Sequence, residues 1–323
     1  MTLHANEVPA GETVVRALLA AQRPEWARLP LTAAGAGTDN SMYRLGDELL
    51  VRLPRTPDTA RSVRKEQHWL PRLAPRLGSA VPEPVHLGVP GPGFPLAWSV
   101  YRWIDGAEPG PDTVRDWAAF GGDLAAFVRE LHGLGLMGAS RADDLDWYRG
   151  GGLRACDDWV TRYLADCREP AGAGAGAAGS GARADAGTAR DPDTVRDPDV
   201  DALEHLWRAA LALPESDAPH VWLHGDLKPS NLLVRDGRLH AVIDFGCLSI
   251  GLPDAEHAPV WDLPAAARRA YRDALDLDEP TWIRARAWAI AVGVSGLAHY
   301  RHTWPAFAAE CLARLRAILA EAG

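Results

Sequence analysis

The spacing of apolar residues predicts a small β-rich segment at the start of the chain. Helical spacing covers residues 12–23 and 61–73. Around these helices, short apolar runs bounded by Gly and Pro predict strands. The expected strands are residues 31–33, 41–45, 48–53, 85–89 and 96–101. Gly46-Asp47 joins the second of these strands to the third as a tight turn, so we expect an antiparallel sheet.

The pattern becomes mainly helical after Gly106. The expected helices are residues 114–134, 157–167 and 201–213, with further helices in the last part of the chain. Two short strands, residues 232–234 and 239–242, interrupt them. The predicted fold class is α+β, with a small antiparallel sheet in a lobe of residues 1–104 and a larger, mainly helical lobe of residues 105–323.

A segment of low complexity interrupts the helical part. Residues 171–187 are rich in Ala and Gly, and two copies of Arg-Asp-Pro-Asp follow, starting at Arg190 and Arg196. Such a composition buries too little apolar area to offset the entropy lost on ordering. We expect a disordered insertion at about residues 170–200.

Composition narrows the class of protein. The formal net charge is −9, which argues against a nucleic-acid partner and is compatible with a cationic one. The four cysteines form no Cys-x-x-Cys pair, which favours reduced thiols in a cytoplasmic protein. No stretch reaches the roughly 20 apolar residues that cross a bilayer, so we expect no membrane partner. Residues 1–9 lack the basic region and apolar run of a signal peptide.

Two polar runs carry the strongest chemical signal. Residues 224–231 read His-Gly-Asp-Leu-Lys-Pro-Ser-Asn, and residues 243–246 read Ile-Asp-Phe-Gly. The hairpin between them is expected to bring Asp226, Asn231 and Asp244 to one end. Phosphoryl transfer to a hydroxyl needs a carboxylate beside that hydroxyl and cationic or N–H groups around the phosphates. The Mg²⁺ ion that accompanies the nucleotide also needs one or two oxygen ligands from the protein. The two runs together meet these needs.

The paired runs resemble the aminoglycoside phosphotransferase family, which has the two-lobed protein-kinase-like fold. The resemblance covers nearly the whole chain outside the insertion, including Val-Arg-Leu-Pro-Arg at 51–55 and Tyr-Arg-His-Thr-Trp-Pro at 300–305. It implies that Asp226 accepts or orients the proton of the substrate hydroxyl. It also implies that Asn231 and Asp244 hold Mg²⁺ and that Lys228 contacts the γ-phosphate of ATP or GTP.

The resemblance implies a nucleotide site in the first lobe. Small residues in the loop at 34–40 permit close approach of backbone N–H groups to phosphates. The residues assigned to this loop's nucleotide contacts are Gly35, Gly37, Thr38 and Asn40. In kinase-like folds adenine pairs with the backbone between the lobes, and Arg102 and Ile104 stand at that position.

Arg52 stands where kinases generally carry a Lys for the α- and β-phosphates. Arg keeps the charge and offers a fork of donors, though with different reach and angle. Glu66 on the next helix is the expected partner. The alternatives are that Glu66 is an ordinary surface charge and that Lys65, on another helix face, is the phosphate cation.

The sequence departs from the family after the second run. The family commonly reads Gly-Asp-Pro and then an Asp a few residues later, whereas this chain has Leu252 in place of the first acid and Glu256 near the second. These acids usually brace the catalytic loop. A loop displaced by about 1 Å can lower the rate roughly a hundredfold, so we expect a looser Asp226. His224 is expected to hold the loop rather than act as a base.

The predicted function is Mg²⁺-dependent transfer of the γ-phosphate of ATP or GTP to a hydroxyl of a small molecule, such as an aminoglycoside or macrolide antibiotic. The alternative is a catalytically impaired, nucleotide-binding protein with the same fold. A serine hydrolase is disfavoured because the chain has no Gly-x-Ser-x-Gly run. The acceptor, the choice between ATP and GTP, and the oligomeric state stay open.

Overall fold

A five-stranded antiparallel sheet dominates the first hundred residues of the computed structural model, which describes residues 6–37, 39–168 and 198–323. The predicted insertion therefore lies almost entirely outside the described residues. The strand order is β1-β2-β3-β5-β4. The strands are β1 (Leu31–Ala36), β2 (Asn40–Leu45), β3 (Leu49–Pro54), β4 (Pro84–Gly88) and β5 (Trp98–Arg102). Each matches an expected strand, with ends that differ by a few residues.

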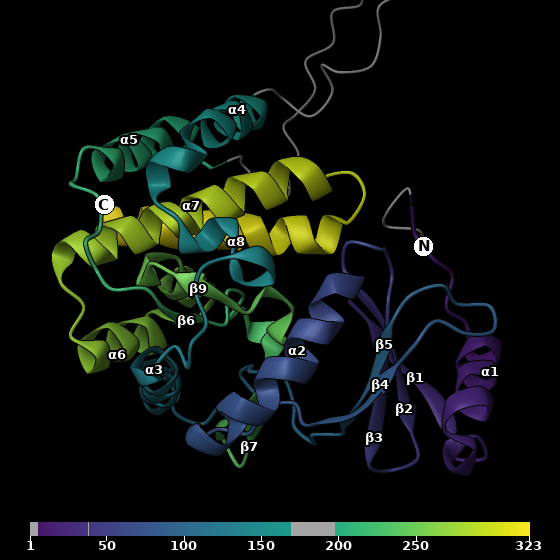
Figure 1. Cartoon of the computed structure of the whole chain (residues 1–323). Coiled ribbons are helices and arrows are strands. Elements are labelled where there is room, and N and C mark those ends of the chain that lie inside the picture. Colours follow the sequence, from purple (N-terminus) through teal and green to yellow (C-terminus); the bar gives the residue numbers. More distant parts are fainter. Residues whose placement is uncertain (1–5, 38, 169–197) are drawn as a thin grey trace, which may run out of the picture. The chain divides into compact units, whose positions relative to one another are not determined.

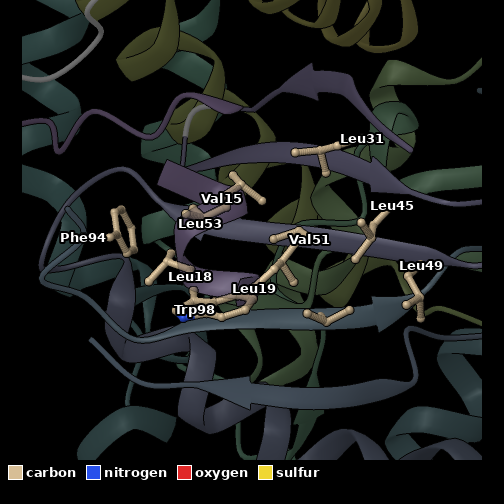
Figure 2. Packing of buried hydrophobic residues seen from close by; sticks show 11 residues of the cluster. Val15, Leu18, Leu19, Leu31, Leu45, Leu49, Val51, Leu53, Phe94 and Trp98 are labelled. Atoms are coloured by element: carbon tan, nitrogen blue, oxygen red, sulfur yellow. The ribbon is translucent and has the colours of Figure 1, made fainter. Parts of the chain in front are cut away.

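Helix α1 (Glu12–Gln22) covers one face of this sheet. Its apolar side chains Val15, Leu18 and Leu19 are fully buried. Figure 2 shows them lying against side chains of the strands and of the loop before β5. The strand and loop members of this cluster are Leu31, Leu45, Leu49, Val51, Leu53, Phe94, Trp98 and Val100. Complete burial stabilises each of these side chains by roughly 1.5–3 kcal/mol, which fixes the sheet that carries Arg52.

Helix α2 (Ala60–Leu73) packs against β4 and β5 and contributes the buried Glu66. Beyond it, two short strand pairs follow. They are β6 (Val221–Leu223) with β9 (Ser249–Gly251), and β7 (Leu232–Arg235) with β8 (Arg238–Val242). The β7–β8 turn has positive φ at Asp236 (55°) and Gly237 (84°), as a tight hairpin turn requires. This hairpin separates the two polar runs, as the sequence predicted.

The remaining helices match the predicted helical part, although α3 begins three residues later than expected. Asp116 caps α3 by accepting hydrogen bonds from the N–H groups of Ala118 and Ala119, so the helix starts at Trp117. The helices are α3 (Trp117–Gly133), α4 (Asp157–Arg168), α5 (Val200–Leu211), α6 (Ala265–Leu275), α7 (Glu279–Tyr300) and α8 (Pro305–Ala322) (Figure 1). None of these described helices is long and apolar enough to cross a membrane.

The described chain forms two compact units. The larger combines residues 1–151 with 216–285, and the smaller combines residues 152–215 with 286–323. Within the larger unit, Gly121 of α3 lies so close to α6 that a Cβ atom there would sit 2.1 Å from the Ala267 carbonyl oxygen. Within the smaller unit, Trp207 of α5 donates to Asp157 of α4 at 2.8 Å. The expected lobe boundary after residue 104 stays a prediction.

Candidate active site

The first polar run follows β6 and is held in place by glycine geometry. Gly225 has φ +82°, and a Cβ atom there would lie 2.6 Å from the carbonyl oxygen of Cys247, so only glycine fits. His224 is fully buried, and its Nε2 forms a hydrogen bond of 2.9 Å with the Ile243 carbonyl oxygen. Burial lowers the pKa of His224, which fits a neutral ring that holds the loop. The predicted structural role of His224 is confirmed.

The carboxylate of Asp226 is surrounded by donors. Its Oδ1 accepts a hydrogen bond from Arg149 Nη1 at 3.0 Å. Its Oδ2 accepts from Asn231 Nδ2 at 3.2 Å and lies 3.5 Å from Lys228 Nζ. The structure therefore brings together three of the predicted site residues and adds Arg149, which the sequence analysis missed.

Charge around Asp226 keeps it ionised. Burial by itself raises the pKa of this carboxyl, but the charge of Arg149, and then that of Lys228, lowers the pKa to about 2. An aspartate with so low a pKa is a weak proton acceptor at neutral pH. It is suited to orient a hydroxyl group and to take its proton late in the reaction.

Asp244 adopts an unusual backbone conformation at the start of the second run. Its φ and ψ are 63° and 69°, a left-handed conformation that costs energy for a residue with a side chain. Its Oδ1 accepts a hydrogen bond from Arg52 Nη2 at 2.6 Å. Such strain is typical of residues held for function, and here it directs the carboxylate toward the sheet residue Arg52.

Arg52 forms a buried network with α2. Its Nη1 donates to Glu66 Oε2 at 2.9 Å, and the hydroxyl of Tyr101 donates to the same oxygen at 2.8 Å. Burial opposes the charge on Arg52, but the carboxylates of Glu66 and Asp244 raise the pKa of the guanidinium above its ordinary value. The predicted pairing of Arg52 with Glu66 is confirmed, and the surface-charge alternative for Glu66 is wrong.

The oxygen atoms near Asp226 and Asp244 fit a magnesium ion. Asn231 donates its amide Nδ2 to the carbonyl oxygen of Asp226 at 2.8 Å, which leaves its Oδ1 as the atom to offer a cation. Asp244 has a second carboxylate oxygen besides the one that Arg52 contacts, and its side chain is 41% exposed. Amide and carboxylate oxygens are the ligands that Mg²⁺ prefers, with water and phosphate completing the shell. Among the described residues, no cluster of three His, Cys, Asp or Glu side chains offers a site for a softer metal.

The residues predicted to contact phosphate lie where β1 turns into β2: Gly35 is near the end of β1, Gly37 lies between the strands and Asn40 begins β2. Gly35 has φ +96°, which favours glycine, and among the described residues a Cβ atom on Gly35 or Gly37 would meet no neighbour within 4 Å. The N–H of Gly37 donates to the carbonyl oxygen of Asn40 at 3.1 Å, which closes the turn. Thr38 lies outside the described residues. The loop is open in front of Gly35 and Gly37, as close approach of a phosphate requires.

The predicted adenine contacts lie at the end of β5. The N–H of Arg102 donates to the Glu83 carbonyl oxygen at 2.9 Å, and the N–H of Trp103 donates to Glu48 at 2.8 Å. The N–H of Arg102 is therefore already paired, so its carbonyl is the group that would meet a base. Ile104 follows the strand, and within the described chain no backbone acceptor pairs with its N–H.

Glu256 braces the catalytic loop. It lies in the short helix η8 (Pro253–Asp262), and its two carboxylate oxygens accept from the N–H groups of His224 at 2.7 Å and Gly225 at 2.8 Å. Burial raises the pKa of Glu256 to about 7, against the lowering effect of these two hydrogen bonds. The loop is therefore held at two points despite Leu252, and the looser Asp226 expected from that departure has no support in this geometry.

Comparison with known proteins agrees with this geometry. Residues 30–288 match the model of a family described as "Phosphotransferase enzyme family". No curated protein matches the chain.

Similar solved structures include the GDP complex of wild-type aminoglycoside 2'-phosphotransferase-IIIa, with 17% identity, a TM-score of 0.71 and coverage of 97% of this chain and 100% of that one. Macrolide 2'-phosphotransferase type I is 18% identical, with a TM-score of 0.62 and coverage of 98% of this chain and 99% of that one. Macrolide 2'-phosphotransferase MphH from Brachybacterium faecium is 22% identical, with a TM-score of 0.54 and coverage of 92% of this chain and 95% of that one. These likenesses confirm the predicted α+β, kinase-like fold.

Proposed function

The chain belongs to the phosphotransferase enzyme family, and from this premise we propose that it moves the γ-phosphate of a nucleoside triphosphate to a hydroxyl group of a small molecule. The observation that carries the proposal is the environment of Asp226. Its carboxylate lies against Arg149, Asn231 and Lys228, so an ionised base stands beside groups that bind phosphate and metal.

Each residue of the site has a separate role in the proposed reaction. Asp226 accepts a hydrogen bond from the acceptor hydroxyl and takes its proton as the acceptor oxygen bonds to the γ-phosphorus. The bond from that phosphorus to the departing diphosphate breaks in the same step. Lys228 and Arg52 supply positive charge toward the phosphates. Asn231 and Asp244 would hold Mg²⁺, which offsets negative charge on the transferring group.

The donor is a purine nucleoside triphosphate. Structurally similar enzymes were solved with GDP, with ATP and with ADP, so that fold accommodates both bases. In this chain the carbonyl of Arg102 and the N–H of Ile104 offer an acceptor and a donor to the base edge. Gly35 and Gly37 allow the phosphates to approach the loop between β1 and β2.

The acceptor is a small hydroxylated ring compound. Similar structures hold kanamycin, gentamicin or streptomycin, and others are macrolide phosphotransferases. Here Trp147 and Tyr148 are 39% and 42% exposed, with ring centroids 5.1 Å apart, and they directly precede Arg149. These two rings offer an apolar surface to a sugar or macrolide ring near Asp226. A cationic acceptor would be favoured by the net charge of −9.

The test is direct. Purified protein is incubated with Mg²⁺ and either ATP or GTP against panels of aminoglycosides, macrolides and hydroxylated metabolites, and products are detected by mass. We expect one acceptor class to gain a phosphate, and Asp226→Ala to abolish that gain. Nucleotide binding in a thermal-shift assay without transfer to any acceptor would instead support the catalytically impaired alternative.

A further inference from the structure

Arg55 closes the Val-Arg-Leu-Pro-Arg run at 51–55, and the proposed reaction gives it no role. It directly follows strand β3, and only 8% of it is exposed. Its Nη1 donates a hydrogen bond to Glu7 Oε1, and the side chain of Glu7 is 14% exposed. Separating two charges so far removed from water is costly, because each would stay buried without its counterion. Glu7 therefore fixes where the Arg55 side chain lies.

The backbone of Arg55 joins an N-terminal segment, residues 7–10, to the turn between β1 and β2. Its carbonyl oxygen accepts from the N–H of Val8 at 2.6 Å, and its N–H donates to the carbonyl oxygen of Asp39 at 2.8 Å. The last paired residues of β2 and β3 are Asn40 and Pro54. The hydrogen bonding between these two strands is thus continued beyond their ends by Arg55.

The segment of residues 7–10 is itself anchored to the sheet. Val8 and Ala10 are partly buried and pack against the apolar cluster that α1 forms with the strands. The carbonyl oxygen of Ala10 accepts from the hydroxyl of Tyr43 at 2.6 Å, and Tyr43 belongs to β2. Glu7 thus acts on Arg55 from a segment that the core holds in place.

Asp39 leads directly to the residues predicted to contact phosphate. The next residue, Asn40, is 6% exposed, and its carbonyl oxygen accepts from the N–H of Gly37 at 3.1 Å. Among the described residues, a Cβ atom on Gly37 would meet no neighbour within 4 Å, so this side of the turn is held by hydrogen bonds rather than by packing. A path of backbone hydrogen bonds therefore connects Val8, through Arg55 and Asp39, to Gly37.

We propose that Glu7 and Arg55 are positioning residues for the nucleotide: their ion pair holds Asp39, and so keeps the turn between β1 and β2 shaped for the phosphates. This inference rests on the proposed function, because it takes this turn to be the phosphate site. Both side chains act through the backbone, without contact to the nucleotide. A preformed turn spares the nucleotide the entropy of ordering it, so loss of the pair weakens phosphate binding and leaves the transfer step unchanged.

The first test measures nucleotide affinity in Glu7→Ala. Dissociation constants for ATP and GTP with Mg²⁺, and for adenosine and guanosine, which carry no phosphate, are measured by calorimetry. The triphosphate that the wild type binds should bind about 3- to 30-fold more weakly to the variant, whereas the matching nucleoside should keep its affinity. In turnover, the KM for nucleotide should rise by the same factor, and kcat at saturating nucleotide should equal that of the wild type.

Glu7→Gln keeps an oxygen for Arg55 without the charge, so its triphosphate affinity should lie between those of Glu7→Ala and the wild type. It carries the same comparison if the alanine variant does not fold. Glu12→Ala is the matched control, because Glu12 also pairs with an arginine, Arg16, at 2.8 Å, but on the exposed surface of α1. It should leave every affinity unchanged.

Two results of the binding experiment would overturn the inference. One is a Glu7 variant that keeps the wild-type affinity for the triphosphate. The other is a variant that loses affinity for triphosphate and nucleoside equally, because general damage to the sheet has that effect.

Amide hydrogen exchange tests the path without nucleotide. In the free protein, the N–H groups of Gly37 and Arg55 should exchange faster in Glu7→Ala than in the wild type, and at the wild-type rate in Glu12→Ala. Equal rates in Glu7→Ala and the wild type would overturn the inference whether or not the enzyme is active. Failure of the proposed function is a separate result, namely wild-type protein that binds neither triphosphate or transfers no phosphate to any acceptor.

Discussion

Arg52 donates a hydrogen bond to Asp244 across 2.6 Å and so joins strand β3 to the residue that we propose as a magnesium ligand. The same guanidinium pairs with Glu66 at 2.9 Å. In this arrangement the single positive charge of Arg52 is shared between two carboxylates. Arg52 thus links strand β3 both to helix α2 and to the second polar run.

Removing this arginine should destabilise the protein strongly. Arg52→Ala leaves Glu66 buried without its cation, which costs about 3–5 kcal/mol of unfolding free energy. Chemical denaturation at pH 7 measures this loss. Arg102→Ala is the control, because Arg102 pairs with Glu48 on the exposed surface, where such a pair contributes about 0–1 kcal/mol. Equal losses in the two variants would contradict the assigned role of Arg52.

Loss of an oxygen ligand should weaken the binding of Mg²⁺ at the site. Asp244→Ala removes the carboxylate proposed to hold Mg²⁺, so we expect at least a roughly 100-fold loss of kcat/KM and a higher Mg²⁺ concentration for half-maximal activity. Asp236→Ala, in the β7–β8 turn, is the matched control and should keep the wild-type Mg²⁺ dependence. Chelation with EDTA should stop transfer by the wild type. Unchanged Mg²⁺ dependence in Asp244→Ala would remove this residue from the metal site.

Local signals made much of this fold predictable. The β2–β3 hairpin follows from two apolar runs separated by Gly46-Asp47, and Gly46 has the positive φ, 59°, that such a turn needs. Arg52 and Glu66 were paired because the family resemblance places them where kinases carry a strand lysine and its glutamate partner on the next helix. In each case the contacting residues are close in the sequence, so the contact can be predicted from this one sequence.

Long-range contacts were not predictable in the same way. Strands β6 and β9 have three residues each, which is too short to give a periodic signal in the sequence. They pair with each other although the whole β7–β8 hairpin lies between them in the chain. Arg149 contacts Asp226, which is 77 residues away in the sequence, and nothing in the local sequence of Arg149 identifies that partner. The one available signal was the glycine run from Gly150 to Gly152, because consecutive glycines permit the close backbone contact seen with Gly251.

Glu256 should make stability depend on pH near neutrality. Its folded pKa, about 7, is raised above the ordinary value of 4.5 by burial. The folded state therefore binds a proton more tightly than the unfolded state does. This contribution to stability is fully present below about pH 4.5 and is lost as the pH rises through about 7.

Glu256→Gln removes this titration while it keeps a side chain of the same size. We expect the unfolding free energy of the wild type to fall more between pH 5 and pH 8, measured by urea denaturation, than that of the variant. Subtracting the pH dependence of the variant from that of the wild type removes the contribution of other groups that titrate in both proteins. A variant with the same pH dependence as the wild type would show that Glu256 stays ionised throughout.

A buried histidine pair in the larger unit should set the acid limit of the fold. Burial lowers the pKa of His132, on α3, to about 4 and that of His257 to about 3, and their ring centroids are 5.8 Å apart. His257 Nδ1 forms a hydrogen bond of 2.7 Å with the Tyr271 hydroxyl, whereas His132 Nε2 is buried without a hydrogen-bond partner in the described chain.

Both folded pKa values lie below the ordinary value of 6.5, so the unfolded state binds protons first as the pH falls. Stability is therefore complete above about pH 6.5 and is lost progressively toward pH 4 and below. His132→Leu removes one such group and one unpaired buried nitrogen, so we expect an acid-unfolding midpoint at lower pH, followed by circular dichroism, with stability at pH 7 equal or higher. His302→Leu, at an exposed histidine, should leave the midpoint unchanged. If His132→Leu unfolded at the same or higher pH than the wild type, the buried neutral ring would not be what limits the protein in acid.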